Sequence, residues 1–279
     1  MSMVTINAFD NKELFIELFN GYTVYAPYTL PLNAYAHFVF NFSEDKERLA
    51  LIGQCGTQQG IIHAGTFDHG YGCIYLLFAD SNQMALELVR IAEKWFVEKG
   101  ITTIKSPCGF PSPYKYILHG SEPYGWAGNY HANNAFRRLG YDLELDIIVM
   151  SMKLDTTQNN MPCPDFDIKE EIIRDDELAL AGYFHTFHKG KWAGRCGYHL
   201  LRGLGSKRGQ VEIWLEDTYH GKELAQYLME MAHNRLAQLG AKHVMLATNQ
   251  ALFRAVCFYQ KLGYTPEPIR AYSYVKIVE

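Results

Sequence analysis

Two stretches of the chain show the same helical pattern of apolar positions, 140 residues apart. In residues 84–104 and 224–244, apolar side chains recur at positions i, i+4, i+7, i+8 and i+12, which places them on one face of a helix. Each pattern stops at a glycine, Gly100 or Gly240, where a helix commonly ends, and a short strand-forming run follows. Both halves of the chain therefore predict a helix followed by a strand.

A second pair of segments supports an internal repeat. Residues 132–142 resemble residues 255–265 at an offset of 123, and both contain the tripeptide Leu-Gly-Tyr. The difference between the two offsets places 17 extra residues in the first half, between Ile104 and Ala132. This insertion is rich in Pro, Gly and aromatic residues, so we expect an ordered loop that forms a ligand-binding wall, a domain interface or ordinary loop packing. The alternative to a repeat is two unrelated units with generic patterning.

The complete pattern predicts an α/β fold with mixed, mostly antiparallel sheets flanked by helices. A chain of 279 residues with 48% hydrophobic residues has room for about two domains. We place these domains at residues 1–155 and 166–279, with the polar segment 156–165 as a linker. Helices are expected near 11–19, 28–37, 82–99, 129–139, 175–188, 221–239 and 250–261. Strands are expected near 38–42, 48–54, 59–66, 72–78, 101–105, 143–154, 166–173, 197–202, 209–216, 242–248 and 269–278.

Several classes of protein are disfavoured by the composition. The sequence shows no secretory signal pattern at its start and no apolar run of membrane-spanning length, so we expect no membrane association and a cytoplasmic location. The six cysteines are scattered, and His185 and His188 lack supporting ligands, so we expect free thiols and no metal site. A net charge of −4 disfavours nucleic-acid binding. The oligomeric state is left open between monomer and homodimer.

The most informative segment for chemistry is residues 211–232. A strand-forming run ends near Leu215, and a short turn with His220 and Gly221 leads directly into a long helix. Unpaired backbone N–H groups and the positive end of the helix dipole make such a turn a natural site for a pyrophosphate. Lys222 adds a positive charge, and Gly221 permits close approach of the backbone.

This segment resembles the cofactor-binding motif of the GNAT superfamily of N-acetyltransferases, whose usual form is Gln/Arg-x-x-Gly-x-Gly/Ala. Gly221, Lys222 and Ala225 fit common family usage, whereas His220 replaces Gln/Arg and Glu223 replaces the central glycine. The resemblance implies acetyl-CoA as co-substrate, without a metal. The implied cofactor-binding residues are Trp214, Leu215, His220, Gly221, Lys222, Glu223, Leu224, Ala225 and Asn249.

A second family motif, Asn-x-x-Ala-x-x-x-Tyr-x-x-x-Gly-Phe, resembles residues 252–264. Leu252 stands at the asparagine position, and Asn249, three residues earlier, is a candidate substitute. Tyr259 matches the tyrosine that in many family members protonates the departing CoA thiolate, and a phenol can supply that proton. The alternative role for Tyr259 is helix packing.

The general base is less clear from the sequence. We favour Glu212, on the strand before the turn. The other candidates are Glu216, His185, His188, His199 and a water relay.

The first half of the chain is expected to be a degenerate copy. Residues 78–88 lack a glycine-containing turn, and Phe136 stands where the second half has Tyr259. The first half also has 11 basic and 16 acidic residues, whereas the second has 15 and 14, which suits an anionic cofactor better.

The sequence as a whole predicts an N-acetyltransferase that acetylates the amine of a small molecule or peptide. The alternatives are a non-catalytic GNAT-like binding or sensor protein and an unrelated α/β enzyme or interaction protein.

Overall fold

The structure, a computed structural model, falls into two compact units. Unit 1 comprises Met1–Ile147 and Ile269–Glu279, and unit 2 comprises Ile148–Pro268. The described residues are 3–24, 29–42, 46–67, 70–107, 112–118, 125–154, 165–205, 207–221 and 223–278. Both predicted domains have counterparts, but strands β7 (Asp142–Lys153) and β13 (Thr265–Ile277) contribute to both units, so the units differ from residues 1–155 and 166–279. The predicted linker 156–165 lies outside the described residues except for Asp165.

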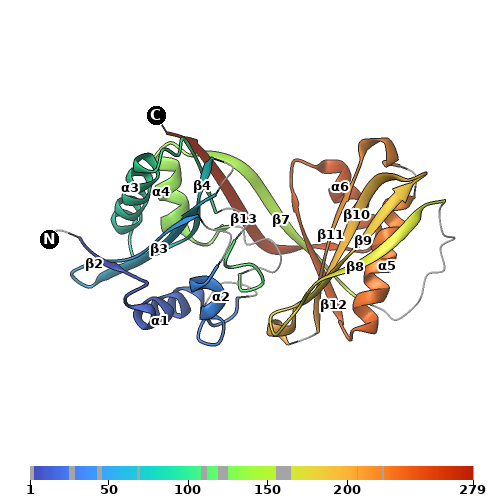
Figure 1. Cartoon of the computed structure of the whole chain (residues 1–279), viewed down its shortest axis with the longest axis horizontal. Helices are drawn as coiled ribbons and strands as arrows, with labels where there is room; N and C mark the ends of the chain where they lie inside the picture. The colour runs from blue at the N-terminus through green and yellow to red at the C-terminus, as the bar shows by residue number, and fades with distance from the viewer. Residues whose placement is uncertain are drawn as a thin grey trace. The chain divides into compact units, whose positions relative to one another are not determined.

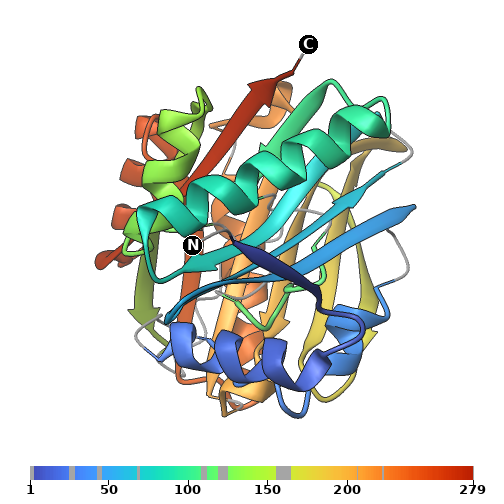
Figure 2. The same ribbon diagram turned by 90° about the vertical axis from the view of Figure 1, so that its left-hand side faces the viewer.

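Unit 1 is a mixed sheet with helices on both faces. Its strand order is β1-β2-β3-β4-β5-β13-β7, and β6 pairs with β13. The helix α3 packs on β2, β3 and β4, and α1 contacts β3 and β4 from the opposite face (Figures 1 and 2). The elements that lie wholly in unit 1 are β1 (Val4–Asn7), α1 (Lys12–Thr23), α2 (Ala36–Phe40), β2 (Glu47–Cys55), β3 (Gln58–Thr66), β4 (Tyr71–Ala79), α3 (Asn82–Glu98), β5 (Thr103–Ser106), β6 (Gly125–Trp126) and α4 (Tyr130–Arg138).

Unit 2 repeats the central part of this arrangement. Its strand order continues from β7 as β12-β11-β10-β9-β8, and helix α5 packs along β10 and β11 (Figure 1). The elements that lie wholly in unit 2 are β8 (Asp167–Asp175), β9 (Leu180–His188), β10 (Lys191–Leu200), the short 3-10 helix η1 (Arg202–Leu204), β11 (Arg208–Leu215), η2 (Asp217–Tyr219), α5 (Leu224–Gln238), β12 (His243–Asn249) and α6 (Phe253–Lys261).

The predicted repeat is confirmed in the register of the parallel strands. β4 and β5 pair at three positions, and β11 and β12 pair at three positions. Gly72, in the middle of the first pairing, lies against the ring of Phe96, and a Cβ there would come within 2.3 Å of it. Gly209, in the middle of the second, would meet Leu236 at 2.6 Å. Each glycine therefore lets its helix pack closely on the strand beneath.

The helix ends also match between the two units. Gly100 and Gly240 follow α3 and α5 with φ of 74° and 92°, and the next residues donate back to the carbonyls of Phe96 and Leu236. This is a glycine-terminated Schellman end, as the sequence pattern predicted.

The predicted helix over 175–188 is wrong, because these residues form a turn and strand β9. Gly182, Phe184 and Thr186 are buried while the residues between them are half-buried, which is the period of a strand. β9 pairs antiparallel with β8 on one side and β10 on the other, so long-range pairing overrides the local helical appearance of the segment. The prediction for 28–42 is also wrong in detail, since the helix here is Ala36–Phe40 and residues 38–42 form no strand.

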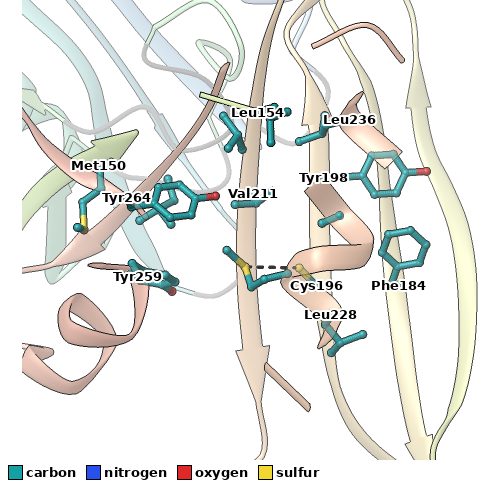
Figure 3. Close-up of a cluster of buried hydrophobic side chains, with 14 of the residues drawn as sticks. Met150, Leu154, Phe184, Cys196, Tyr198, Val211, Leu228, Leu236, Tyr259 and Tyr264 are labelled. Atoms are coloured by element: carbon teal, nitrogen blue, oxygen red, sulfur yellow. Dashed lines mark hydrogen bonds between the residues drawn. The ribbon is translucent and has the colours of Figure 1, made fainter. Parts of the chain in front are cut away.

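The buried core of unit 2 lies between its sheet and helices α5 and α6. Leu228 and Leu236 of α5, Val211 of β11 and Tyr259 of α6 all belong to this one cluster (Figure 3). No helix within the described ranges is long and apolar enough to span a bilayer. The cysteines among those residues (Cys55, Cys73, Cys196 and Cys257) are free thiols.

Candidate active site

The turn between β11 and α5 holds two residues with left-handed backbone. Gly221 has φ 75°, and Glu223, the residue immediately before α5, has φ 61° and ψ −11°. Glycine adopts this conformation freely, whereas a glutamate is strained by its Cβ. Glu223, which stands at the central glycine position of the motif, therefore has a backbone conformation that glycine adopts more easily. Lys222 lies outside the described residues.

The N-terminus of α5 has no side-chain cap. In unit 1, Ser81 caps α3 by accepting a hydrogen bond from the backbone N–H of Met84, at 3.2 Å. Glu223 occupies the corresponding cap position of α5 but makes no such bond. Within the described part of the chain, the first-turn N–H groups of α5 therefore have no side-chain acceptor, and they lie at the positive end of the helix dipole. This arrangement attracts an anion.

Between matched positions of its strand and its helix, unit 2 has three more residues than unit 1. Matched strand glycines, Gly72 and Gly209, are 137 residues apart, whereas the matched helix residues Phe96 and Leu236 are 140 apart. The extra length accommodates η2, and Glu216 holds the start of the turn by donating its N–H to the carbonyl of Ala193 at 2.9 Å.

Strands β11 and β12 stop pairing before either strand ends. Their parallel pairs run from Arg208–His243 to Gln210–Met245, yet β11 continues to Leu215 and β12 to Asn249. Among the described residues, the facing backbone edges beyond Gln210 and Met245 do not pair with each other, which makes them a candidate place for a ligand. Because the strands are parallel, this end of the pair is also the end where the turn into α5 lies, the usual place for a ligand in an α/β sheet.

Glu212 lies on the sheet face opposite α5. It is paired with Gly197 across β10 and β11, and a Cβ on Gly197 would come within 2.8 Å of the Glu212 Cγ. Its carboxylate oxygen Oε1 is 3.9 Å from Nε2 of the fully buried His199, and the Glu212 side chain is 27% exposed. Burial raises the pKa of the Cys196 thiol, and Glu212 adds to that shift.

Tyr259 lies on the other face of the sheet. It is buried in the α5-side core, with its ring centroid 6.1 Å from that of Tyr264, and Figure 3 shows it beside Met150 and Tyr264. The same cluster contains Leu215 and Leu224, at the two ends of the β11–α5 turn. A ligand held between the facing edges of β11 and β12 would therefore have the face with Glu212 on one side and the face with Tyr259 on the other.

The remaining predicted cofactor residues divide into backbone and side-chain candidates. The side chains of Leu215 and Leu224 belong to the core, so only their backbone groups are available, and Ala225 is half-buried beside them. Nε2 of His220 lies 3.2 Å from the Leu215 carbonyl oxygen. The Oδ1 of Asn249 accepts from the N–H of Ala251 at 2.9 Å, which closes the turn after β12.

The alternative bases are dispersed. His185 bonds to Glu171 at 2.9 Å, His188 packs against the rings of Phe166 and Tyr219, and Glu216 is exposed. Among the described residues, no group of three His, Cys, Asp or Glu side chains is arranged to hold a metal.

Sequence reasoning missed two features of the site. Trp192 stacks on Trp214 although the two are distant in the chain, and only the β10–β11 pairing brings them together. Asn129, which caps α4, is matched to Leu252 by the offset of 123, so extending the repeat by three residues would have found it.

Comparison with known proteins finds a family match in the C-terminal region. Residues 149–264 match the model of the acetyltransferase (GNAT) family. No curated protein matches the chain significantly.

Solved structures match along the whole chain, at low sequence identity. A tandem GNAT protein from the clavulanic acid biosynthesis pathway is similar with a TM-score of 0.70 and 13% identity, covering 99% of this chain and 98% of the other. A GCN5-related N-acetyltransferase from Sphaerobacter thermophilus has a TM-score of 0.60 and 12% identity, covering 99% and 95%. A glucosamine N-acetyltransferase region of a fungal multi-domain GH3 β-N-acetylglucosaminidase has a TM-score of 0.67 and 11% identity, covering 98% of this chain and 38% of that one.

These matches agree with the mixed sheets, the repeated parallel pairings and the strand–turn–helix of unit 2. The chain has the tandem GNAT fold, and its residues 149–264 match the model of the acetyltransferase (GNAT) family.

Proposed function

We propose that unit 2 binds acetyl-CoA and transfers the acetyl group to an amine. The observation that carries this proposal is the uncapped N-terminus of α5, which follows a turn with left-handed Gly221 and Glu223. The pyrophosphate would accept from the first-turn N–H groups of α5, with Lys222 as an added charge. The acyl arm would lie along the open backbone edge of β11, near Trp214 and Leu215.

The two proposed catalytic groups act from opposite faces of the sheet. The amine nitrogen attacks the thioester carbonyl carbon, the new N–C bond forms and the C–S bond breaks. Glu212 takes the proton that the amine nitrogen loses, and Tyr259 gives a proton to the departing thiolate. The products are the acetylated amine and free CoA. Tyr259, the acid, and Glu212, the base, lie on different faces of the sheet. Both can act on one thioester only if the thioester lies between the parts of β11 and β12 that do not pair with each other.

Glu223 and Leu252 favour a second candidate function, a non-catalytic GNAT-like protein. Glu223 brings a carboxylate to the position where the pyrophosphate would bind, and Leu252 leaves α6 without a side-chain cap. Both features weaken a cofactor site without removing its backbone donors.

Isothermal titration of the full-length protein with acetyl-CoA tests binding. Saturable binding of one equivalent is expected, with the affinity falling as salt is raised because the pyrophosphate contact is electrostatic. Absence of binding at millimolar acetyl-CoA would refute the acetyltransferase proposal. Binding without thiol release across a panel of amines and amino acids would favour the non-catalytic alternative.

Replacing Tyr259 by phenylalanine tests the acid. We expect kcat to fall by about 100-fold, within the range for loss of a general acid, while the Kd for acetyl-CoA stays the same. The matched control is Phe136→Leu, at the corresponding position of unit 1, which should leave kcat unchanged. Equal turnover of Tyr259→Phe and the wild type would remove Tyr259 from the acid role.

A further inference from the structure

Two exposed tryptophans stack on each other at the sheet surface of unit 2. Trp192 of β10 and Trp214 of β11 have ring centroids 4.6 Å apart and planes inclined by 22°. Trp192 is 40% exposed and Trp214 is 49% exposed. Large aromatic side chains left in water on a strand surface commonly mark a binding site. Each ring has one face covered by its partner, so another planar group can extend the stack.

The tryptophan pair lies on the same face of the sheet as Glu212. Trp214 and Glu212 are two residues apart on β11, so their side chains point the same way, with about 7 Å between their Cα atoms. Gly197 is paired with Glu212, and its lack of a side chain lets Glu212 and the ring of Tyr183 pack over the strand, since a Cβ there would come within 2.8 Å of both.

Among the residues that the structure describes, the connection between β8 and β9 of unit 2 contains no helix. β8 ends at Asp175 and β9 begins at Leu180, so the two strands are joined by a short turn. In unit 1, the corresponding connection between β1 and β2 contains α1 and α2, and α1 packs on the sheet. In the described part of unit 2, the connection between the first two strands therefore holds no counterpart of α1.

Positive charge accompanies the tryptophan pair. Arg195 is paired with Trp214 across the two strands, and its guanidinium lies 4.3 Å from the ring centroid of Tyr183. Lys189 and Lys191 are exposed on the hairpin that leads to Trp192. The acidic residues Glu216 and Asp217 belong to the turn after β11.

We propose that Trp192, Trp214 and Arg195 bind the acceptor, and that this acceptor is an α-amino acid with an aromatic side chain. The aromatic ring extends the tryptophan stack, the carboxylate pairs with Arg195, and the amine reaches Glu212 further along β11. The three groups of such a molecule match the apolar, cationic and anionic groups of this surface. The inference rests on the proposed acetyl transfer for its chemistry, whereas binding of the amino acid can be measured without it.

Titration of the full-length protein with L-phenylalanine, with and without acetyl-CoA, tests the proposal. Phenethylamine lacks the carboxylate and L-alanine lacks the ring, so each should bind at least about tenfold more weakly than phenylalanine. Arg195→Gln should remove the preference for phenylalanine over phenethylamine. Trp192→Leu should weaken phenylalanine binding by about tenfold and leave the Kd for acetyl-CoA unchanged. The control Phe253→Ser, an exposed aromatic at the start of α6, should change neither affinity.

The outcomes separate this inference from the proposed function. If acetyl-CoA binds but phenylalanine does not bind at millimolar concentration, the acceptor proposal is overturned and the cofactor site stands. If phenylalanine binds equally well to wild type and Trp192→Leu, or no better than alanine, the tryptophan surface is not its site. If phenylalanine binds with the expected pattern but acetyl-CoA does not, the surface is a binding site and the transferase proposal fails.

Discussion

Replacing Glu223 by glycine tests both the strain and the charge at the candidate cofactor turn. A left-handed backbone costs a residue with a Cβ roughly 1–2 kcal/mol. Glycine relieves this strain, but its greater conformational freedom in the unfolded chain lowers the free energy of unfolding by about 0.4–1 kcal/mol. It also loses the attraction between the carboxylate and the N-terminus of α5, about 0.3–1 kcal/mol. Glu223→Gly alone should therefore change stability little.

Glu223→Ala is the matched control that isolates the backbone. Alanine loses the same charge but keeps the strained conformation at φ 61°. We therefore expect the glycine variant to be more stable than the alanine variant by about 1 kcal/mol, measured as a shift in the urea midpoint at unchanged slope. Equal midpoints for the two variants would refute the left-handed strain at this position.

Glu223→Gln isolates the charge, because it keeps the side-chain length and the backbone strain. A like charge near a bound anion costs about 1 kcal/mol in a solvent-exposed setting, which corresponds to about a fivefold change in affinity. Glu223→Gln should therefore bind acetyl-CoA about fivefold more tightly at low salt, and the gain should shrink at high salt. Unchanged affinity at low salt would show that the carboxylate does not oppose the pyrophosphate.

Two further changes follow from buried or uncapped groups. Burial lowers the pKa of His63 to about 3 and that of His233 to about 4, so both stay neutral in the folded protein while the unfolded chain binds protons below about pH 6.5. Each histidine should lower the free energy of unfolding by about 2 kcal/mol between pH 7 and pH 5. His233→Gln should therefore lose about half of this pH dependence, measured by urea unfolding. The same dependence of unfolding free energy on pH in the variant and the wild type would contradict the lowered pKa of His233. Leu252→Asn should stabilise α6 by about 1 kcal/mol in urea unfolding, because Asn129 already caps α4 in this way, and no gain would mean that the cap geometry differs between the copies.

The helices were predictable where their ends are encoded locally. Amphipathic spacing with a terminal Gly100 or Gly240 located α3 and α5 to within a few residues. β9 was not predictable in this way, because a short segment with mixed aromatic and small residues fits both the helical period of 3.6 residues and the strand period of 2. Its pairing with β8 and β10 decided between them.

The unit boundaries could not be read from the sequence. The C-terminal strand enters unit 1 through pairs such as Tyr274 with Ser106, which are 168 residues apart. The domain limits at 155 and 166 came from polar composition, which carries no information about such long-range pairs. The site was partly predictable, since strand alternation separates Glu212 from the core. The stacking of Trp192 on Trp214 depends on the same kind of pairing and was missed.

The two copies have diverged in complementary ways at three matched places. Unit 1 caps α3 with Ser81, so its own side chain takes the helix donors that an anion would use. Unit 2 leaves the same donors of α5 without a side-chain cap and lengthens the turn before them. Unit 1 has the asparagine that caps α4 but has Phe136 about two turns further along, whereas unit 2 has no such cap and has Tyr259 at the position that corresponds to Phe136.

A cap and a ligand compete for the same backbone donors, so stability and anion binding favour different residues at one helix end. The cap at α3 suits a structural copy, and the open end of α5 suits a binding copy. Phe136 has no hydroxyl, so the position of unit 1 that corresponds to Tyr259 has no proton to give to a thiolate. Chemistry is therefore expected in unit 2, and Phe136→Tyr in unit 1 should add no activity, because in that copy Ser81 already takes the N–H of Met84 at the start of α3.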